Sequence, residues 1–439
     1  MKKVREGYKM TELGEIPSEW EIKSIGEIFD FSGGLSISRA KLTDKGVNYL
    51  HYGDIHMRNE NYINTDKDEV WLPKIEDNFE EIKENVKLNS GDVVFADASE
   101  DYEGIGKSVA IFNDFEKPFV AGLHTIVAKD INNQLENNYK RYCFSTNEVR
   151  KQFRYLATGT SVYGISRENI KKIKINIPTI KEQEKIASIL STVDEQIDNV
   201  DALIEKNKEL KKGLMQTLLT KGIGHTKFKK TEIGEIPEEW EVKNLSEVVW
   251  YQEGPGLRKW QFTSAGIKVI NVTNLVGNYL DLSNTSRYID ESEIEKKYKH
   301  FLIDENDIVV ASSGNSWGKV SVVRKIDLPL LMNTSVIRFK PMEEERLSSK
   351  YLLQFLKSDA FKKQIALLIT GSAQPNFGPY HLDRTKIATP NINEQLRIAS
   401  ILSEVDKKIE EYENKKQKLE EFKKGLMQQL LTGMIRVTV

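Results

Sequence analysis

"IPTIKEQEKIASILSTVDEQIDNVDALIEKNKELKKGLMQTLLT" occupies Ile177–Thr220, and a close copy, "TPNINEQLRIASILSEVDKKIEEYENKKQKLEEFKKGLMQQLLT", occupies Thr389–Thr432. In both stretches apolar residues recur at alternating spacings of three and four, which is typical of a helix that packs along one narrow stripe. The predicted seam of this helix pair consists of Ile186, Leu190, Val193, Ile197, Val200, Ile204, Ile398, Leu402, Val405, Ile409 and Tyr412.

A long helix with so thin an apolar stripe is unstable alone and needs a partner. Each copy offers the other a matching stripe, so we expect an antiparallel coiled-coil pair that acts as a spacer of roughly 55–60 Å. The alternative at this point is that the two stretches form separate helical hairpins inside ordinary cores.

A second pair of copies marks the start of each half of the chain. "GEIPSEWE" at Gly14–Glu21 returns as "GEIPEEWE" at Gly234–Glu241, and we expect Trp20 and Trp240 to anchor two cores. The repeat is far longer than the unit of a solenoid or propeller, so it indicates a domain duplication. We expect globular modules at 1–178 and 224–390, followed by helices at 179–223 and 391–439.

Within each module, short β-like runs alternate with turn signals, as in "DVVFAD" (Asp92–Asp97) and "DIVVASS" (Asp307–Ser313). Helix-like stretches follow these runs. The predicted fold class is therefore α+β: two tandem modules with twisted, mostly antiparallel sheets, joined by the helix pair in a pseudo-two-fold repeat.

Composition suggests a globular protein with a highly charged surface, with 39% apolar and 30% charged residues and a formal net charge of −2. No apolar run reaches the ~20 residues that span a bilayer, so we expect a cytoplasmic protein without a membrane partner. Nine Lys or Arg against two acids between Tyr139 and Asn176 suggest a local basic surface despite the net charge.

No catalytic constellation, metal site or cofactor motif is predicted. "DYEGIGKS" (Asp101–Ser108) resembles a phosphate-binding loop but lacks its first glycine and precedes a β-like run, so we interpret it as a sheet turn. The six histidines lack metal-ligand spacing, and Cys143 is expected to be a small buried residue.

Turns rich in Gly, Ser, Asn, aromatic and basic residues recur at matching places in the two modules, with different side chains. Such residues read base edges and phosphates, and their divergence on a common frame favours recognition of two different targets. The candidate DNA-contacting residues are Ser36, Arg39, Tyr52, Asp54, Tyr102, Lys107, Thr160, Ser161, Tyr163, Arg167, Arg258, Trp260, Thr273, Asn274, Asn315, Trp317, Lys319, Ser372, Gln374 and Asn376.

The chain resembles the specificity subunit of type I restriction-modification systems, through "GEIPSEWE", "IPTIKEQEKIASILSTVDEQI", "KKGLMQTLLT" and their second copies. The resemblance implies a non-catalytic subunit whose modules are target recognition domains, one for each half of a bipartite, asymmetric duplex DNA site. It implies as partners two methyltransferase subunits, which use S-adenosylmethionine, and two restriction and motor subunits, which use ATP. No cofactor is implied on this chain.

Two other hypotheses remain. A coiled-coil adaptor that binds only proteins would explain the helices but not the paired, loop-rich modules. A duplicated enzyme is disfavoured because no paired catalytic residues occur in both halves.

Overall fold

The computed structural model describes residues 4–283, 285–369 and 376–438. The chain divides into two compact units, each of which draws on both long helices. Unit 1 comprises Met1–Asp201 and Asn414–Val439, and unit 2 comprises Ala202–Glu413.

Unit 1 is built on a five-stranded sheet with the order β4 (Phe29–Gly33), β12 (Thr125–Asp130), β8 (Val93–Ala96), β10 (Ser108–Phe112) and β6 (Tyr62–Asn64). A three-stranded sheet has the order β11 (Phe119–Ala121), β5 (Val47–Leu50) and β7 (Lys74–Ile75). The pairs β10–β6 and β11–β5 are parallel, and the other pairs in these two sheets are antiparallel.

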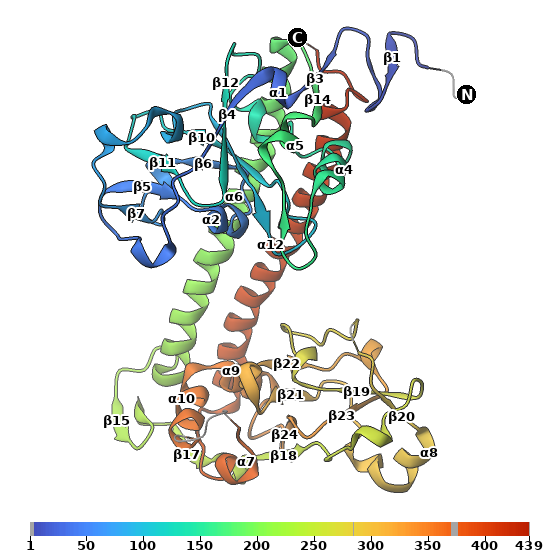
Figure 1. Ribbon diagram of the computed structural model, residues 1–439. Coiled ribbons are helices and arrows are strands. Elements are labelled where there is room, and N and C mark those ends of the chain that lie inside the picture. Colours follow the sequence, from blue (N-terminus) through green and yellow to red (C-terminus); the bar gives the residue numbers. More distant parts are fainter. Residues whose placement is uncertain (1–3, 284, 370–375, 439) are drawn as a thin grey trace. The chain divides into compact units, whose positions relative to one another are not determined.

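Alternation along the strands of the larger sheet places its side chains in two of the cores of unit 1. Phe95 and Ile126 lie in one core with helices α4 (Asn147–Leu156) and α5 (Arg167–Lys171), whereas Val94 lies in the other with residues of the smaller sheet. The larger sheet is therefore covered on both faces. Shorter elements of unit 1 are β1 (Tyr8–Thr11), β2 (Gly14–Pro17), β3 (Glu21–Ser24), α1 (Ile25–Ile28), α2 (Tyr52–Met57), α3 (Thr65–Asp68), β9 (Ala98–Ser99), β13 (Tyr163–Gly164) and β14 (Lys174–Ile177) (Figure 1).

Unit 2 repeats this plan. Its larger sheet has the order β18 (Val249–Glu253), β24 (Val336–Pro341), β21 (Ile308–Ala311) and β22 (Val320–Val322), and its smaller sheet β20 (Tyr288–Ile289), β19 (Ile267–Ile270) and β23 (Leu330–Met332). The remaining elements are β15 (Phe228–Thr231), β16 (Gly234–Pro237), β17 (Glu241–Asn244), α7 (Leu245–Val248), α8 (Glu291–Glu293), α9 (Ser349–Lys357), α10 (Asp359–Leu368), α11 (Pro379–Leu382) and β25 (Lys386–Thr389). The predicted α+β class and the internal repeat are confirmed.

The two long stretches form helices α6 (Ile180–Lys221) and α12 (Ile392–Leu431). In unit 1, Asp194 of α6 pairs with Lys423 of α12 at 2.5 Å and Asp201 with Lys416 at 2.7 Å. In unit 2, Lys211 pairs with Asp406 at 2.6 Å. As residue numbers rise along α6, the numbers of their partners on α12 fall, so the two helices are antiparallel. The alternative of separate helical hairpins is therefore wrong.

Most predicted seam residues are buried, while Ile197 and Tyr412 are only half-buried. The ends of the seam do more than join the helices. Ile186 and Leu190 belong to the core of unit 1 that contains residues of α4 and α5, which we call the helix-side core. Ile398 and Leu402 belong to the corresponding core of unit 2. Each module is therefore fused to the helix pair by a common core.

In each unit, the repeated phrase that begins the module contacts the first turn of the long helix that follows the module. Trp20 Nε1 donates a hydrogen bond to Glu182 Oε2 at 3.0 Å, and Trp240 Nε1 donates to Glu394 Oε2 at 3.1 Å. Both tryptophans are 1% exposed, which confirms that they are core anchors. The tryptophan of "GEIPSEWE" or "GEIPEEWE" thus binds the glutamate of the "EQ" pair at the start of the following helix, which explains why each half carries both phrases.

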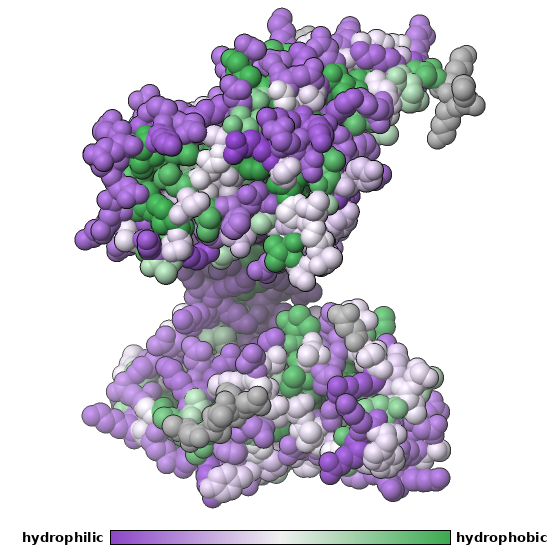
Figure 2. All heavy atoms as spheres, in the orientation of Figure 1, coloured by the Kyte–Doolittle hydropathy of each residue, from purple (hydrophilic) through white to green (hydrophobic). Residues whose placement is uncertain are grey.

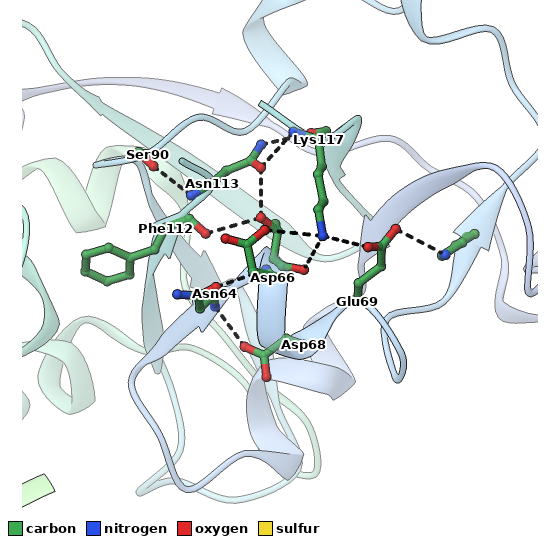
Figure 3. A network of polar contacts seen from close by, with 10 residues as sticks. Asn64, Asp66, Asp68, Glu69, Ser90, Phe112, Asn113 and Lys117 are labelled. Carbon is green, nitrogen blue, oxygen red and sulfur yellow. Dashed lines mark hydrogen bonds and ion pairs between the residues drawn. The ribbon is translucent and has the colours of Figure 1, made fainter. Parts of the chain in front are cut away.

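A polar network holds the edge of the sheets in unit 1 (Figure 3). Asn113 Oδ1 accepts hydrogen bonds from Thr65 Oγ1 at 2.8 Å and from the Lys117 backbone N–H at 2.9 Å, and Lys117 Nζ pairs with Glu69 at 2.7 Å. The buried Asn113 side chain is satisfied by local groups, so this network stabilises a turn. Figure 2 shows a mainly hydrophilic surface on the visible side of each unit, with apolar residues in small groups.

Candidate nucleic-acid interface

Five loop segments of unit 1 meet in one place, which we call the loop face of unit 1: residues 33–39, 51–58, 97–107, 122–125 and 157–167. Backbone hydrogen bonds tie them together, and the donor and acceptor pairs are Gly34 N to Thr125 O (3.1 Å), Gly122 N to Leu50 O (2.9 Å), Asp97 N to His124 O (3.1 Å) and Ile165 N to Asp97 O (2.8 Å). The loop face is therefore held by main chain and its outward side chains are free to vary.

The loop face of unit 2 comprises residues 253–261, 271–278, 312–319, 333–335 and 376–379. Four of its backbone bonds match the four given for unit 1: Gly254 N to Val336 O (3.0 Å), Asn333 N to Ile270 O (3.0 Å), Ser312 N to Ser335 O (2.9 Å) and Phe377 N to Ser312 O (3.0 Å). The two units thus present equivalent frames that carry different side chains.

An aromatic and histidine cluster distinguishes the loop face of unit 1. The Tyr52 ring centroid lies 4.6 Å from that of His51 and 5.3 Å from that of His124, and His124 Nδ1 lies 3.1 Å from Asp97 Oδ1. Unit 2 has Ser335 and Ser312 in place of His124 and Asp97. This cluster is not predicted from the sequence, because only the strand pairing brings His124 and Asp97 to the neighbouring residues His51 and Tyr52.

The structure divides the candidate DNA-contacting residues by exposure. Tyr52, Lys107, Tyr163 and Trp317 are half-buried, Asp54 and Asn274 are buried, and Ser372 and Gln374 lie outside the described residues. The exposed candidates are Ser36, Arg39, Tyr102, Thr160, Ser161, Arg167, Arg258, Trp260, Thr273, Asn315, Lys319 and Asn376.

Asp54 and Asn274 have the same local role in the two units. Asp54 Oδ2 accepts the His51 backbone N–H at 3.2 Å, and Asn274 Oδ1 accepts the Asn271 backbone N–H at 2.9 Å. Burial raises the pKa of Asp54, although the hydrogen bond from His51 and nearby Arg39 oppose this. Both residues cap a short helical turn and so shape the loop face from within.

Lys107 also acts inside the fold. Its ammonium donates to the carbonyl oxygen of His56 at 3.2 Å and to that of Arg58, and burial lowers its pKa. This contact anchors the chain that leaves α2. In unit 2 the equivalent residue, Lys319, is exposed.

The basic run between residues 139 and 176 is only partly a surface. Lys140 pairs with Asp130 at 3.3 Å, Arg141 pairs with Asp194 at 2.7 Å, and Arg150 donates to the Ile105 carbonyl at 2.6 Å. Burial lowers the pKa of Arg150 to about 10. The expectation of a basic surface is therefore wrong for these three side chains, which are used in internal contacts.

Other sequence interpretations are also resolved. The "DYEGIGKS" loop leads into strand β10 and not into a helix, which confirms the sheet turn. Cys143 is buried, as expected, and burial raises its pKa. Among the described residues there is no group of three His, Cys, Asp or Glu that could hold a metal ion. In the same part of the chain, no helix is long and apolar enough to cross a bilayer.

Comparison with known proteins agrees with the duplicated frame. A family model for the type I restriction modification DNA specificity domain matches residues 17–210 and again residues 237–421. The chain belongs to this family. Type I specificity subunits recognise the DNA target and associate with modification and restriction subunits, which carry the enzymatic activities.

Curated relatives of this specificity subunit come from Methanocaldococcus jannaschii. The type I restriction enzyme MjaVIII specificity subunit is 35% identical over 67% of this chain and 70% of the relative. The putative type I restriction enzyme MjaX specificity subunit is 29% identical over 98% of this chain and 97% of the relative.

Solved structures show the same fold. The S subunit of a type I restriction-modification system from M. genitalium has a TM-score of 0.55 at 16% identity and covers 99% of both chains. A chain from a study of complex assembly and conformational transition of the type I R-M system has a TM-score of 0.58 at 14% identity, covering 96% of this chain and 99% of that chain.

Proposed function

We propose that each unit reads one part of a bipartite, asymmetric duplex DNA sequence through its loop face. The observation that carries this proposal is that four backbone hydrogen bonds recur at equivalent positions in two loop faces whose outward side chains differ. A recognition frame that is duplicated and then diverges is suited to two targets, whereas an adaptor has no need of divergent loops.

In this proposal, residues 1–178 and 224–390 act as target recognition domains, and residues 179–223 and 391–439 act as spacer and docking helices. The exposed candidates in the loop faces contact bases or phosphates, and the buried caps Asp54 and Asn274 support them. The complex contains two methyltransferase subunits and two restriction subunits for each specificity subunit, and it acts on DNA in the cytoplasm.

The spacer follows from helix geometry. At about 1.5 Å per residue a 42-residue helix such as α6 is roughly 63 Å long. One turn of duplex DNA is about 34 Å, so two modules with breadth of their own have room to address tracts separated by an unread gap. Removing or adding whole turns in both helices should change the length of this gap.

Binding to duplex DNA tests the proposal against the adaptor alternative. Fluorescence anisotropy with randomised duplex, with and without the cognate methyltransferase subunit, should reveal binding that weakens steeply as salt rises, because phosphate contacts release counterions. An absence of salt-sensitive binding under both conditions would leave the adaptor as the better explanation.

A further inference from the structure

Gly33 and Glu253 occupy the same place in the two units. Gly33 ends β4 and pairs with Ile126 of β12, and Glu253 ends β18 and pairs with Ile337 of β24. The next residue in each case is a glycine that bonds to the first residue of the neighbouring strand. The backbone is thus equivalent, and only the side chain differs.

In unit 1 the missing side chain of Gly33 makes room for an arginine. A Cβ atom at Gly33 would lie 3.2 Å from Nη2 of Arg167, the first residue of α5. Arg167 is exposed, and no carboxylate in the described part of the chain lies within salt-bridge distance of it. None of the residues described by the structure accepts a hydrogen bond from this guanidinium, so its donors are open at this point of the loop face.

In unit 2 the same place holds a carboxylate. Glu253 Oε2 lies 3.6 Å from the position of a Cβ at Gly378, the residue that precedes α11, and Tyr251 on the same strand donates a hydrogen bond to Asp383. The contact from Thr334 Oγ1 to Glu253 Oε1 is long, at 3.4 Å. Burial raises the pKa of Glu253.

No Lys, Arg or His in residues 4–283, 285–369 and 376–438 forms an ion pair with Glu253. A half-buried carboxylate without a cation costs stability, so its presence calls for a role in binding. On a surface that meets DNA, the phosphates repel a carboxylate, and the groups that attract it are the amino donors on base edges.

We propose that Arg167 and Glu253 are specificity-determining residues that read opposite base chemistry from equivalent places. Arg167 donates to O6 and N7 of a guanine in the part of the site read by unit 1, and Glu253 accepts from the N4 amino group of a cytosine in the part read by unit 2. This inference rests on the proposed function and assigns one base to each half-site.

Selection from a randomised duplex library tests the assignment. The complex of the full chain with its methyltransferase subunit is used, as wild type and as Arg167→Gln, Arg167→Lys, Glu253→Gln and Glu343→Gln. Glu343 lies two residues after Pro341, at the end of β24 remote from the loop face of unit 2, and pairs with Arg346 at 2.8 Å, so its variant is a control for loss of a carboxylate outside the loop face. The unaltered half-site in each variant serves as an internal control for folding.

We expect Arg167→Gln to lose about 10- to 100-fold of the preference for one G·C pair in one half-site, with a smaller loss for Arg167→Lys, which keeps the charge but not the bidentate geometry. Glu253→Gln should lose a similar preference for one C·G pair in the other half-site, and Glu343→Gln should select the wild-type motif.

The inference is overturned if the Arg167 and Glu253 variants select the complete wild-type motif, or if either changes both half-sites. It is also overturned if Glu253→Gln weakens the thermal stability of unit 2 without altering sequence preference, since that result assigns Glu253 a purely structural role. A wild-type complex that selects no motif would instead remove the proposed function, and this inference with it.

Discussion

Asp194 on α6 joins three parts of unit 1, and its removal gives a sharp test of how the module is held. Its carboxylate accepts from Arg141 Nη2 at 2.7 Å, from Tyr142 Oη at 2.6 Å and from Lys423 Nζ at 2.5 Å. The side chain of Arg141 is only 8% exposed. Asp194→Ala therefore leaves a buried guanidinium without its counter-charge.

Removing one partner of a buried ion pair costs about 3–5 kcal/mol, a range that includes the loss of the hydrogen bond from Tyr142. We expect Asp194→Ala to lower the free energy of unfolding of unit 1 by this amount. Asp194→Asn, which keeps one acceptor, should lower it by about 2 kcal/mol. Hydrogen exchange in a urea series, read on peptides from each unit separately, measures both values.

Asp198, one turn further along α6, provides the matched control. Burial, Asp194 and Glu60 all raise its pKa, and none of the described residues forms an ion pair with it. Asp198→Ala should change the stability of unit 1 by less than about 0.5 kcal/mol. A cost of less than about 1 kcal/mol for Asp194→Ala, or equal destabilisation of unit 1 by the two variants, would contradict this role of Asp194.

Three further predictions concern stability. Burial lowers the pKa of Lys357 to about 8, so between pH 8 and about 10.5 the unfolded chain binds more protons at this group than the folded chain does. The free energy of unfolding of unit 2 therefore rises with pH, by up to about 3 kcal/mol from this group. Urea unfolding at about pH 7.5 and about pH 10 should show this rise in the wild type but not in Lys357→Met. Leu190 is fully buried in the helix-side core, and Leu190→Ala should cost about 2–5 kcal/mol in unit 1, measured by hydrogen exchange, with an unchanged value counting against the fused core. Trp20→Phe removes the donor to Glu182 and part of the buried indole, and a loss of at least about 1–3 kcal/mol in denaturant unfolding is expected, whereas a neutral result would contradict the role of Trp20 as a core anchor.

The sequence predicted the helices and the repeat well because both depend on periodicity. The seam from Ile186 to Ile204 and its copy carry a local pattern that only a long helix satisfies. That the seam ends share a core with each module was not predicted, since the core to which Leu190 belongs also contains residues of α4, β8 and β12, far away in the chain.

Individual side chains were harder to predict because turn residues have several possible uses. Asn274 has the chemistry of an adenine reader, yet it caps a turn, and Arg141 in the basic run pairs with Asp194 on a distant helix. The sequence does not single out Glu253, because one carboxylate at the end of a strand forms no pattern. Its significance appears only when strand register shows that Glu253 is equivalent in unit 2 to Gly33, beside which Arg167 lies in unit 1.

In the proposed function, two divergent loop faces on one chain read two parts of a DNA site. Single-molecule methylome sequencing of cells that express this chain with its methyltransferase subunit tests it most directly. We predict one asymmetric, two-part methylated motif with an unread gap, in which replacing residues 312–319 changes one part only. A continuous motif without a gap, or a motif in which that replacement changes both parts, would contradict the account.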